Sequence, residues 1–410
     1  MMKKVKVGIL GLGRGAYLGT VLMQNGADVV AVCEQDSQKV EKAKNLLGKN
    51  IAVFDEFDAM LDYGVDAVLL TNFFHEHAKY AVKALERGIH VLSECISNAT
   101  MAEGVALVRA AEKSGAIYML SENYPFMRFN REMKKVYEGG TLGKVLFAEG
   151  EYNHPVDPKD TAFVKGARPF EKHWRHFNAA TYYITHSLAP LMYITGSRPR
   201  RVTAMPIFSP PTEDTPTATY VGDNTAIITT LNDDDSVFRV TGCARFGAHE
   251  NSYRVACTKG QIENVRGTDG KIMLRYNAWD VPEGMEENNF YTPEENSELA
   301  KNAGHGGGDF YIMKEFMDCI REGRRPVFDE YFATNAASVA ILGHRSLMSL
   351  GQPYDIPDFR YENDRKKYEN DWATPFWGSD GTSPNIPCCS RPEYRPSQTQ
   401  LDRYHAALEE

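Results

Sequence analysis

A tyrosine and a histidine stand three residues apart in the segment TYYITHSLAP, as Tyr183 and His186. On a helical turn, side chains at this spacing lie on the same face. A neutral histidine can take a proton from a hydroxyl group, and a tyrosine can donate or accept one. We therefore predict an acid–base pair; the alternative is that His186 is a buried histidine with a purely structural hydrogen bond.

A second polar set ends the apolar run in HVLSECISNAT, where Glu94 and Cys95 follow a predicted strand. The cysteine could be a nucleophile, a redox thiol or a structural residue. No histidine or lysine stands beside it in the sequence to lower the pKa of the thiol. Two more predicted strands end in polar sets, TNFFHEH with Asn72 and His77 and SEN with Asn123.

Parallel β-strands are the elements that must position these sets. Up to about Ser121, short apolar runs such as VKVGIL, VDAVLLT and IHVLSE alternate with segments of helical period such as EHAKYAVKALERG. This alternation predicts right-handed crossovers and a doubly wound parallel sheet. Such sheets bind ligands beyond the carboxyl ends of their strands, which is where the polar sets lie.

The first strand runs into a glycine-rich turn, VKVGILGLGRGAYLG. Gly11, Gly13 and Ala16 fit the G-x-G-x-x-A form of the dinucleotide fingerprint: a tight turn, close approach of a pyrophosphate, and close packing of helix on strand. Glu34 ends the second strand, where a carboxylate accepts hydrogen bonds from ribose hydroxyls and repels a 2′-phosphate. The segment predicts NAD rather than NADP; a turn without a ligand is the alternative.

After residue 123 the pattern changes to longer, β-branched runs separated by turns, such as KVLFAEGEY, TAIITTLN and SVFRVTGCARF. This succession predicts an open, mostly antiparallel β-sheet. We therefore expect an α/β Rossmann domain at 1–123, an α+β domain for substrate and subunit contacts at 124–360, and an irregular C-terminal tail at 361–410. Aromatic residues in the tail indicate that it packs on something, and a partner subunit is one possibility.

The segment EKHWRH offers further polar groups between the predicted strands of the second domain. Arg175 could clamp a pyrophosphate or form a surface salt bridge. His173 and His176 flank Trp174, but no third ligand stands at a recognisable spacing, so we predict no metal site.

Composition excludes several classes of protein. The 410 residues include 55 acidic and 46 basic ones, a net charge of −9, so we expect no nucleic-acid partner. Seven scattered cysteines form no disulfide framework and fit a reducing compartment. The chain starts with a strand rather than a signal peptide and has no apolar run of membrane-spanning length, so we expect a cytoplasmic protein without membrane contact.

Over about the first 350 residues these motifs resemble the Gfo/Idh/MocA family, named after glucose–fructose oxidoreductase and inositol dehydrogenase. The resemblance rests on the fingerprint, HAKYAVKALERGIHVLSE, the Trp174-Arg175 pair and THSLAPLMYITG. It implies a dinucleotide domain, an open sheet that covers the nicotinamide, and a sugar or cyclitol dehydrogenase. Two positions depart from it. The family's Glu-Lys-Pro is Glu94-Cys95-Ile96, and Tyr182 replaces the aspartate four residues before the histidine, so only His186 of the usual triad is kept.

These departures resemble a branch of the family, the NAD-dependent glycosidases typified by α-N-acetylgalactosaminidase, which also lacks the lysine. Its Tyr-x-Thr-His matches Tyr183 to His186, with Ile184 in place of proline, and LSEN and GHGGGD resemble two further segments of that branch. Cys95-Ile96 stands where the branch has Val-Pro. We expect catalysis by His186, Tyr183 and Glu94, and substrate contacts from Tyr182 and His305. The expected cofactor contacts are Gly11, Gly13, Arg14, Gly15, Ala16, Glu34, Asn72, His77, Glu94, Asn123, Trp174 and Arg175.

The resemblance implies a reaction in which NAD takes a hydride from a secondary sugar carbon, usually carbon 3. A base then removes the acidified neighbouring proton, the aglycone leaves, water adds and the hydride returns. We assign His186 to the hydroxyl and Tyr183 to the α-proton, and Cys95 then marks the absent lysine. Two alternatives are a simple sugar or cyclitol dehydrogenase and a non-catalytic nucleotide-binding regulatory protein. The expected partners are a sugar or glycoside and further copies of the chain in a dimer or tetramer.

Overall fold

The computed structural model describes residues 4–211 and 215–409 and divides into two compact units. The ends of the predicted domains at residues 1–3 and 410 lie outside the described residues. The first unit is made of Met1–Lys135, Thr292–Ala337 and Pro357–Asp371, and the second of Val136–Tyr291, Ser338–Ile356 and Trp372–Glu410. Each unit is therefore assembled from three stretches of chain.

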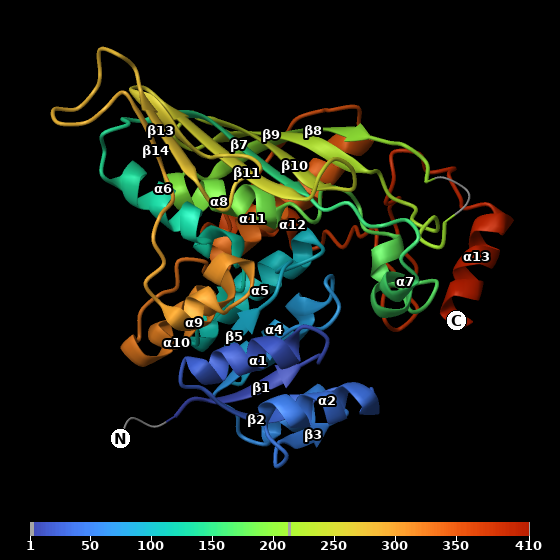
Figure 1. Ribbon diagram of the computed structural model, residues 1–410. Coiled ribbons are helices and arrows are strands. Elements are labelled where there is room, and N and C mark those ends of the chain that lie inside the picture. Colours follow the sequence, from blue (N-terminus) through green and yellow to red (C-terminus); the bar gives the residue numbers. More distant parts are fainter. Residues whose placement is uncertain (1–3, 212–214, 410) are drawn as a thin grey trace. The chain divides into compact units, whose positions relative to one another are not determined.

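The first unit holds a six-stranded parallel sheet in the order β3-β2-β1-β4-β5-β6 (Figure 1). Its strands are β1 Lys6–Leu10, β2 Asp28–Cys33, β3 Ala52–Phe54, β4 Ala67–Leu70, β5 His90–Ser93 and β6 Tyr118–Leu120. The helices between them are α1 Gly15–Gln24, α2 Ser37–Leu47, α3 Phe57–Asp62, α4 His77–Glu86 and α5 Met101–Ser114. Every residue of β4 is buried, as expected for a strand with helices on both faces of the sheet. The predicted Rossmann sheet is confirmed.

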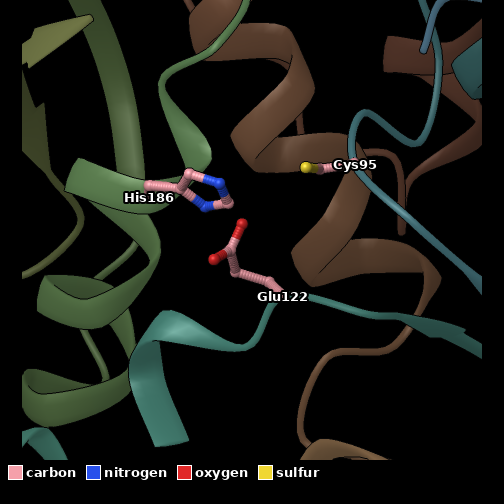
Figure 2. A group of neighbouring side chains, drawn as sticks. All are labelled: Cys95, Glu122 and His186. Carbon is pink, nitrogen blue, oxygen red and sulfur yellow. The ribbon is translucent and has the colours of Figure 1, made fainter. Parts of the chain in front are cut away.

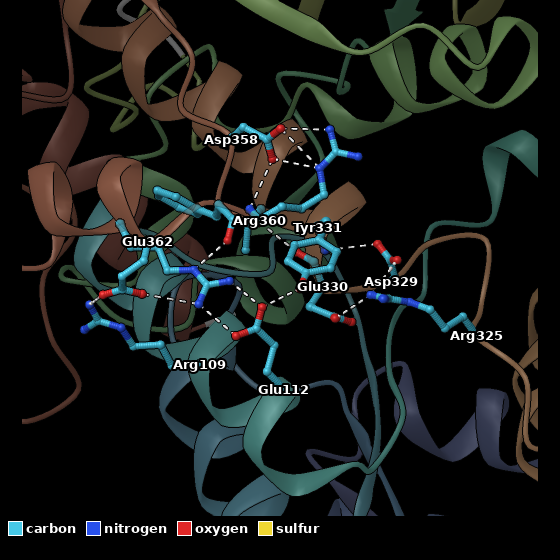
Figure 3. A network of polar contacts seen from close by, with 12 residues as sticks. Arg109, Glu112, Arg325, Asp329, Glu330, Tyr331, Asp358, Arg360 and Glu362 are labelled. Atoms are coloured by element: carbon cyan, nitrogen blue, oxygen red, sulfur yellow. Dashed lines mark hydrogen bonds and ion pairs between the residues drawn. The ribbon is translucent and has the colours of Figure 1, made fainter.

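Later parts of the chain complete the first unit. They contain η1 Tyr124–Phe126, α6 Arg128–Glu138, α9 Glu298–Lys301, η3 His305–Gly307, α10 Gly308–Glu322, α11 Glu330–Met348 and α12 Glu362–Tyr368; α6 and α11 continue into the second unit. Helix α5 contacts two of these parts through ion pairs and a hydrogen bond (Figure 3). Glu112 binds Arg365 and Tyr331, and Arg109 binds Glu362.

The second unit holds a nine-stranded sheet in the order β14-β13-β12-β11-β7-β10-β9-β8-β15. Its strands are β7 Val145–Asn153, β8 Pro199–Ile207, β9 Thr225–Asn232, β10 Val237–Ala244, β11 Glu250–Cys257, β12 Gly260–Asn264, β13 Ile272–Tyr276, β14 Asn288–Tyr291 and β15 Tyr354–Asp355. Neighbouring strands pair antiparallel except β7 and β10, which are parallel. The predicted mostly antiparallel sheet is confirmed.

Several helical segments belong to the same unit. They are α7 Thr161–Ala167, η2 Trp174–His176, α8 Thr185–Thr195 and α13 Gln398–Glu409. Of these, α8 lies against β7, β10 and β11 (Figure 1). Two glycines allow this close approach. A Cβ atom on Gly150 would overlap the carbonyl oxygen of Ser187, and one on Gly242 would overlap that of Ala180. The backbone around Tyr183 and His186 therefore packs directly against the sheet.

The segment at 361–410 contains two helices, α12 in the first unit and α13 in the second. Helix α13 packs on α7 through a cluster of Val164, Tyr404 and Ala407. Within residues 4–211 and 215–409, no helix combines the length and the apolar character needed to cross a membrane.

Candidate active site

The glycine-rich turn has the geometry of a dinucleotide site. Gly11 has a φ of +85°, and a Cβ there would lie 2.7 Å from the carbonyl oxygen of Thr71. A Cβ on Gly15 would overlap the Thr71 hydroxyl, so α1 can start against the sheet only with glycine at this position. A Cβ on Gly13 would meet no atom within 4 Å. A phosphate can therefore reach the backbone at Gly13, beside the first turn of α1 with the buried Ala16.

Two side chains next to the turn fit the rest of the cofactor. The Glu34 carboxylate accepts hydrogen bonds from the backbone N–H of Leu12 at 2.9 Å and of Asp36 at 3.1 Å. These bonds hold a negative charge at the end of β2, where it suits a ribose and repels a 2′-phosphate. Both amide atoms of Asn72 are buried without a hydrogen-bond partner in the described parts of the chain. Such atoms are expected where a ligand completes the site.

His77 opens α4 and is buried. Its Nδ1 lies 3.0 Å from the carbonyl oxygen of Ile96, which joins α4 to the loop after β5. Burial lowers the pKa of His77 to about 4, so the ring is neutral at pH 7. The peptide bond between Cys95 and Ile96 in the same loop is cis.

Four of the predicted residues meet around Asp309, the last residue of GHGGGD. The Asp309 carboxylate accepts hydrogen bonds from Arg14 at 2.7 Å and from Asn123 at 2.6 Å, and His305 Nδ1 lies 3.0 Å away. Arg14 also donates to Glu94 at 3.1 Å. The structure thus brings Arg14, Glu94, Asn123 and His305 into one network. We did not predict Asp309, although its place at the end of a glycine-rich segment was a usable signal.

Burial and the neighbouring charges together set the pKa of both acids. Burial raises the pKa of Glu94, and the Arg14 guanidinium opposes this effect. Burial also acts to raise the pKa of Asp309, but the hydrogen bond from His305 and the charge of Arg14 outweigh it and lower that pKa. The His305 loop is further held by the Tyr17 hydroxyl, which accepts a hydrogen bond from the Gly304 N–H at 2.7 Å.

Cys95 lies in the loop after β5 and Glu122 follows β6, whereas His186 comes from the first turn of α8 in the second unit (Figure 2). The Cys95 thiol is 3.9 Å from Glu94 Oε2, a weak hydrogen bond to a carboxylate. Glu122 accepts a hydrogen bond from the Tyr124 N–H at 3.3 Å.

The predicted pair in the second unit forms an aromatic group with a third ring. The rings of Tyr183 and His186 lie 5.1 Å apart at 85°, and Tyr152 of β7 meets His186 edge-on at 4.9 Å. The Tyr253 hydroxyl donates to the His186 carbonyl oxygen at 2.5 Å and fixes the first turn of α8. Tyr182 lies apart from this group, buried with its ring 5.0 Å from that of Phe376.

Tyr152 and Tyr183 line a cavity of about 360 Å³ in the second unit. Arg175 also lines it, with its guanidinium 4.3 Å from the ring centre of the buried Trp174. His173 Nδ1 accepts a hydrogen bond from the Arg175 N–H, and burial lowers the pKa of His176 to about 3. We did not predict Tyr152; the signal for it was the alternation of side chains along β7.

Two family models match the chain. The one described as "Oxidoreductase family, NAD-binding Rossmann fold", of the Gfo/Idh/MocA type, matches residues 5–122. The one described as "Glycosyl hydrolase 109, C-terminal domain" matches residues 220–364. The first contains the glycine-rich turn and the second most of the nine-stranded sheet.

The similar proteins include glycosyl hydrolases and oxidoreductases. A glycosyl hydrolase family 109 protein from Streptomyces niveus is 26% identical over 419 aligned residues, which cover 93% of this chain and 81% of the relative. One from Streptomyces filamentosus is 27% identical over 387 residues, covering 87% and 77%. Levoglucosan dehydrogenase in complex with NADH and levoglucosan has a TM-score of 0.73 at 16% identity, over 87% of this chain and 100% of that one. An oxidoreductase from Agrobacterium radiobacter in complex with NAD+, L-tartaric acid and magnesium has a TM-score of 0.71 at 15% identity, over 86% and 98%.

The fold, the dinucleotide turn and the matched domains define an NAD-dependent enzyme. Its N-terminal part matches the Gfo/Idh/MocA oxidoreductase model, and its C-terminal part matches the glycosyl hydrolase 109 C-terminal domain. The resemblance seen in the sequence and the expected NAD cofactor are confirmed.

Proposed function

We propose that this enzyme is a redox-neutral glycosidase that oxidises a secondary sugar carbon, eliminates the aglycone, adds water and reduces the sugar again. The observation that carries the proposal is the Tyr183–His186 pair, kept together with Tyr152 while a cysteine replaces the family's lysine. The glycosyl hydrolase 109 domain and the names of the relatives support it.

NAD would be held by the backbone at Gly13, by Glu34 and by Asn72, and when bound it supplies a hydride acceptor and donor. His186 takes the proton of the hydroxyl on the carbon that is oxidised, usually carbon 3. The ketone makes the neighbouring C–H acidic, and Tyr183 removes that proton while the bond to the aglycone breaks. Water then adds to the double bond, and the hydride returns to the ketone.

A simple sugar or cyclitol dehydrogenase is the second candidate, because a sugar dehydrogenase is among the structures that share the fold. It would need His186 to deprotonate the alcohol without the lysine. The matched oxidoreductase and glycosyl hydrolase domains set aside the non-catalytic regulatory alternative.

One experiment separates the two candidates. The protein is incubated with catalytic NAD and a panel of aryl glycosides and free sugars in deuterated water. Release of the aglycone without net NADH, with deuterium at the carbon beside the oxidised one, supports the glycosidase. Stoichiometric NADH from a free sugar, with no aglycone release, would overturn it in favour of the dehydrogenase.

We further infer that the enzyme works in the cytoplasm as a homo-oligomer. All seven cysteines are free thiols, which fits a reducing compartment. The second face of the nine-stranded sheet carries partly exposed charged side chains such as Glu149, Glu151 and Arg254, and an open sheet of this kind offers a surface to a second copy. Sedimentation of the purified protein over a range of concentrations tests the assembly.

A further inference from the structure

Three arginines line the cavity that also contains Tyr152 and Tyr183. They are Arg168 after α7, Arg175 in η2 and Arg245 after β10. Among the described residues that line the cavity there is no aspartate or glutamate. The wall of this cavity is therefore strongly positive in a protein whose net charge is −9.

Arg168 is the most enclosed of the three, with 5% of its surface exposed. Its Nη1 donates to the carbonyl oxygen of Thr217 at 2.8 Å, but its Nε is buried with no hydrogen-bond partner in the described part of the chain. Burial, together with the charge of Arg245, lowers the pKa of Arg168 to about 9. The guanidinium is thus held in place by neutral groups and carries one donor that nothing satisfies.

The other two arginines rest on aromatic rings. The guanidinium of Arg245 lies 3.0 Å from the ring centre of Tyr220, and that of Arg175 lies 4.3 Å from that of Trp174. Neither forms an ion pair with a carboxylate in residues 4–211 or 215–409. Burial lowers the pKa of Arg245, and the charge of Arg175 acts in the same direction. The rings set the orientation of the two cations but leave their charges uncompensated.

Cations without counterions in an enclosed site raise the free energy of the protein, because no opposite charge offsets their desolvation. An anion that enters the cavity would offset this desolvation, since charge-assisted hydrogen bonds to guanidinium are among the strongest that proteins make. Arginine is suited to planar and tetrahedral oxyanions because its donors form a fork. The arrangement therefore fits a carboxylate, a sulfate or a phosphate.

We propose that the substrate carries an anionic group, a carboxylate, sulfate or phosphate ester, that binds among Arg168, Arg175 and Arg245 beside Tyr183. The inference rests on the proposed function only in placing the reacting sugar at Tyr183. An acidic or esterified sugar, rather than a neutral one, is then the preferred substrate. Phosphate ester and sulfate ester differ from carboxylate in geometry, so the three are distinguished by measurement.

The test compares matched aryl hexosides: the neutral parent, its 6-carboxylate, its 6-sulfate and its 6-phosphate. We expect kcat/KM for at least one anionic member to exceed that of the neutral parent by about tenfold or more, as a charge-assisted bond implies. In Arg245→Met, kcat/KM should fall by at least about tenfold more for the anionic substrate than for the neutral one. Arg168→Lys, which keeps the charge, should lose less than Arg168→Met. Arg266→Met is the matched control, because Arg266 binds Glu151 on the sheet outside the cavity.

Binding is measured separately from turnover, by calorimetry with the anionic glycosides and with inorganic sulfate and phosphate. Tighter binding of an anion to the wild type than to Arg245→Met supports the proposal even if the sugar is oxidised without cleavage, an outcome that would sink the proposed glycosidase alone. Equal kcat/KM for all four glycosides would overturn it. Thermal unfolding shows whether the Arg245 and Arg168 variants fold. If folded variants lose affinity for NAD and keep their affinity for the anionic glycoside, the proposal is also overturned, since the cavity would then bind the phosphates of the cofactor.

Discussion

Cys95 occupies the position at which the family resemblance leads one to expect a lysine. Its thiol contacts Glu94 at 3.9 Å, and it cannot supply the fixed positive charge of an ammonium group. The rings of Tyr183, His186 and Tyr152, in contrast, are packed at right angles or stacked, within 4.9–6.2 Å of one another. At the scale of single residues, we expect proton transfer to depend on these rings and not on the thiol.

Substitution of Cys95 by alanine should therefore leave most of the turnover intact. His186→Ala should lower kcat by about 10²–10⁴-fold, the usual contribution of a general base. Steady-state rates of both variants, with NAD binding followed by fluorescence as a control for folding, check this. Equal losses in the two variants would show that the thiol takes part in the chemistry.

Asp309 is the residue on which the network of the first unit depends. Asp309→Asn removes the charge that Arg14, Asn123 and His305 share, and we expect a loss of about 1–3 kcal/mol in the free energy of unfolding. Asp318→Asn on the same helix is the control. Asp318 forms an ion pair with Lys314, whose side chain is half exposed. The loss in the free energy of unfolding should therefore stay below about 1 kcal/mol. Denaturant titrations of the two variants compare them, and similar losses would contradict the central place given to Asp309.

At the scale of elements, the contact of α8 with the sheet depends on glycine. In Gly150→Ala the new methyl group would overlap the Ser187 carbonyl oxygen, so α8 must shift or the strand must bend. We expect the variant to lose about 1–3 kcal/mol of stability and to lose activity through displacement of His186. Gly166→Ala in α7 is the control, since a Cβ there meets nothing within 4 Å and alanine favours a helix. Calorimetry and kcat together check the result.

The C-terminal helix α13 supports a wall of the arginine-lined cavity. Tyr404 donates a hydrogen bond to the Arg168 carbonyl oxygen at 2.8 Å and packs on Val164. A chain that ends before Gln398 should bind its glycoside more weakly yet bind NAD as before, because the dinucleotide turn lies in the other unit. Calorimetry with both ligands tests this, and Tyr404→Phe isolates the hydrogen bond, at a cost of about 1 kcal/mol in stability. Loss of NAD binding in the truncated chain would contradict it.

Features that depend on neighbours in sequence could be predicted, and those that depend on distant segments could not. The parallel sheet follows from apolar runs that alternate with helical segments, and the glycine-rich turn from a local motif. Asp309 binds Arg14 and Asn123 only because α10 returns to the first unit late in the chain. Arg245 likewise stands some seventy residues beyond Arg168 and Arg175, and no local pattern indicates that the three line one cavity. The pairing of α13 with α7 has the same origin.

At the scale of the whole molecule, acid should destabilise the fold through buried histidines. Burial lowers the pKa of His77 and of His344 to about 4 and that of His176 to about 3. Between pH 6.5 and these values the unfolded chain binds more protons than the folded one, so the free energy of unfolding falls as the pH falls. Over two pH units, each of these histidines should lower the free energy of unfolding by about 2–3 kcal/mol.

Urea titrations at pH 6.5 and pH 4.5 measure this loss. His344→Gln should reduce the difference between the two values, because it removes one of the groups that must be protonated on unfolding. His405→Gln on the exposed side of α13 is the control and should leave the difference as it is. A stability that does not change over this interval would contradict the assignment of neutral, buried histidines.

The interleaving of the two units has a consequence for synthesis on the ribosome, where a chain emerges from its N-terminus and domains usually fold in that order. The six strands of the first unit are made early, but Asp309, which binds Arg14 and Asn123, emerges only after the strands of the nine-stranded sheet up to β14. The second unit in turn waits for residues 372–410, which the ribosome makes last. Neither unit can be complete before nearly the whole protein has been translated. We therefore expect nascent chains that stop short of α10 to depend on chaperones, because the first unit then lacks Asp309 and the nine-stranded sheet lacks β15.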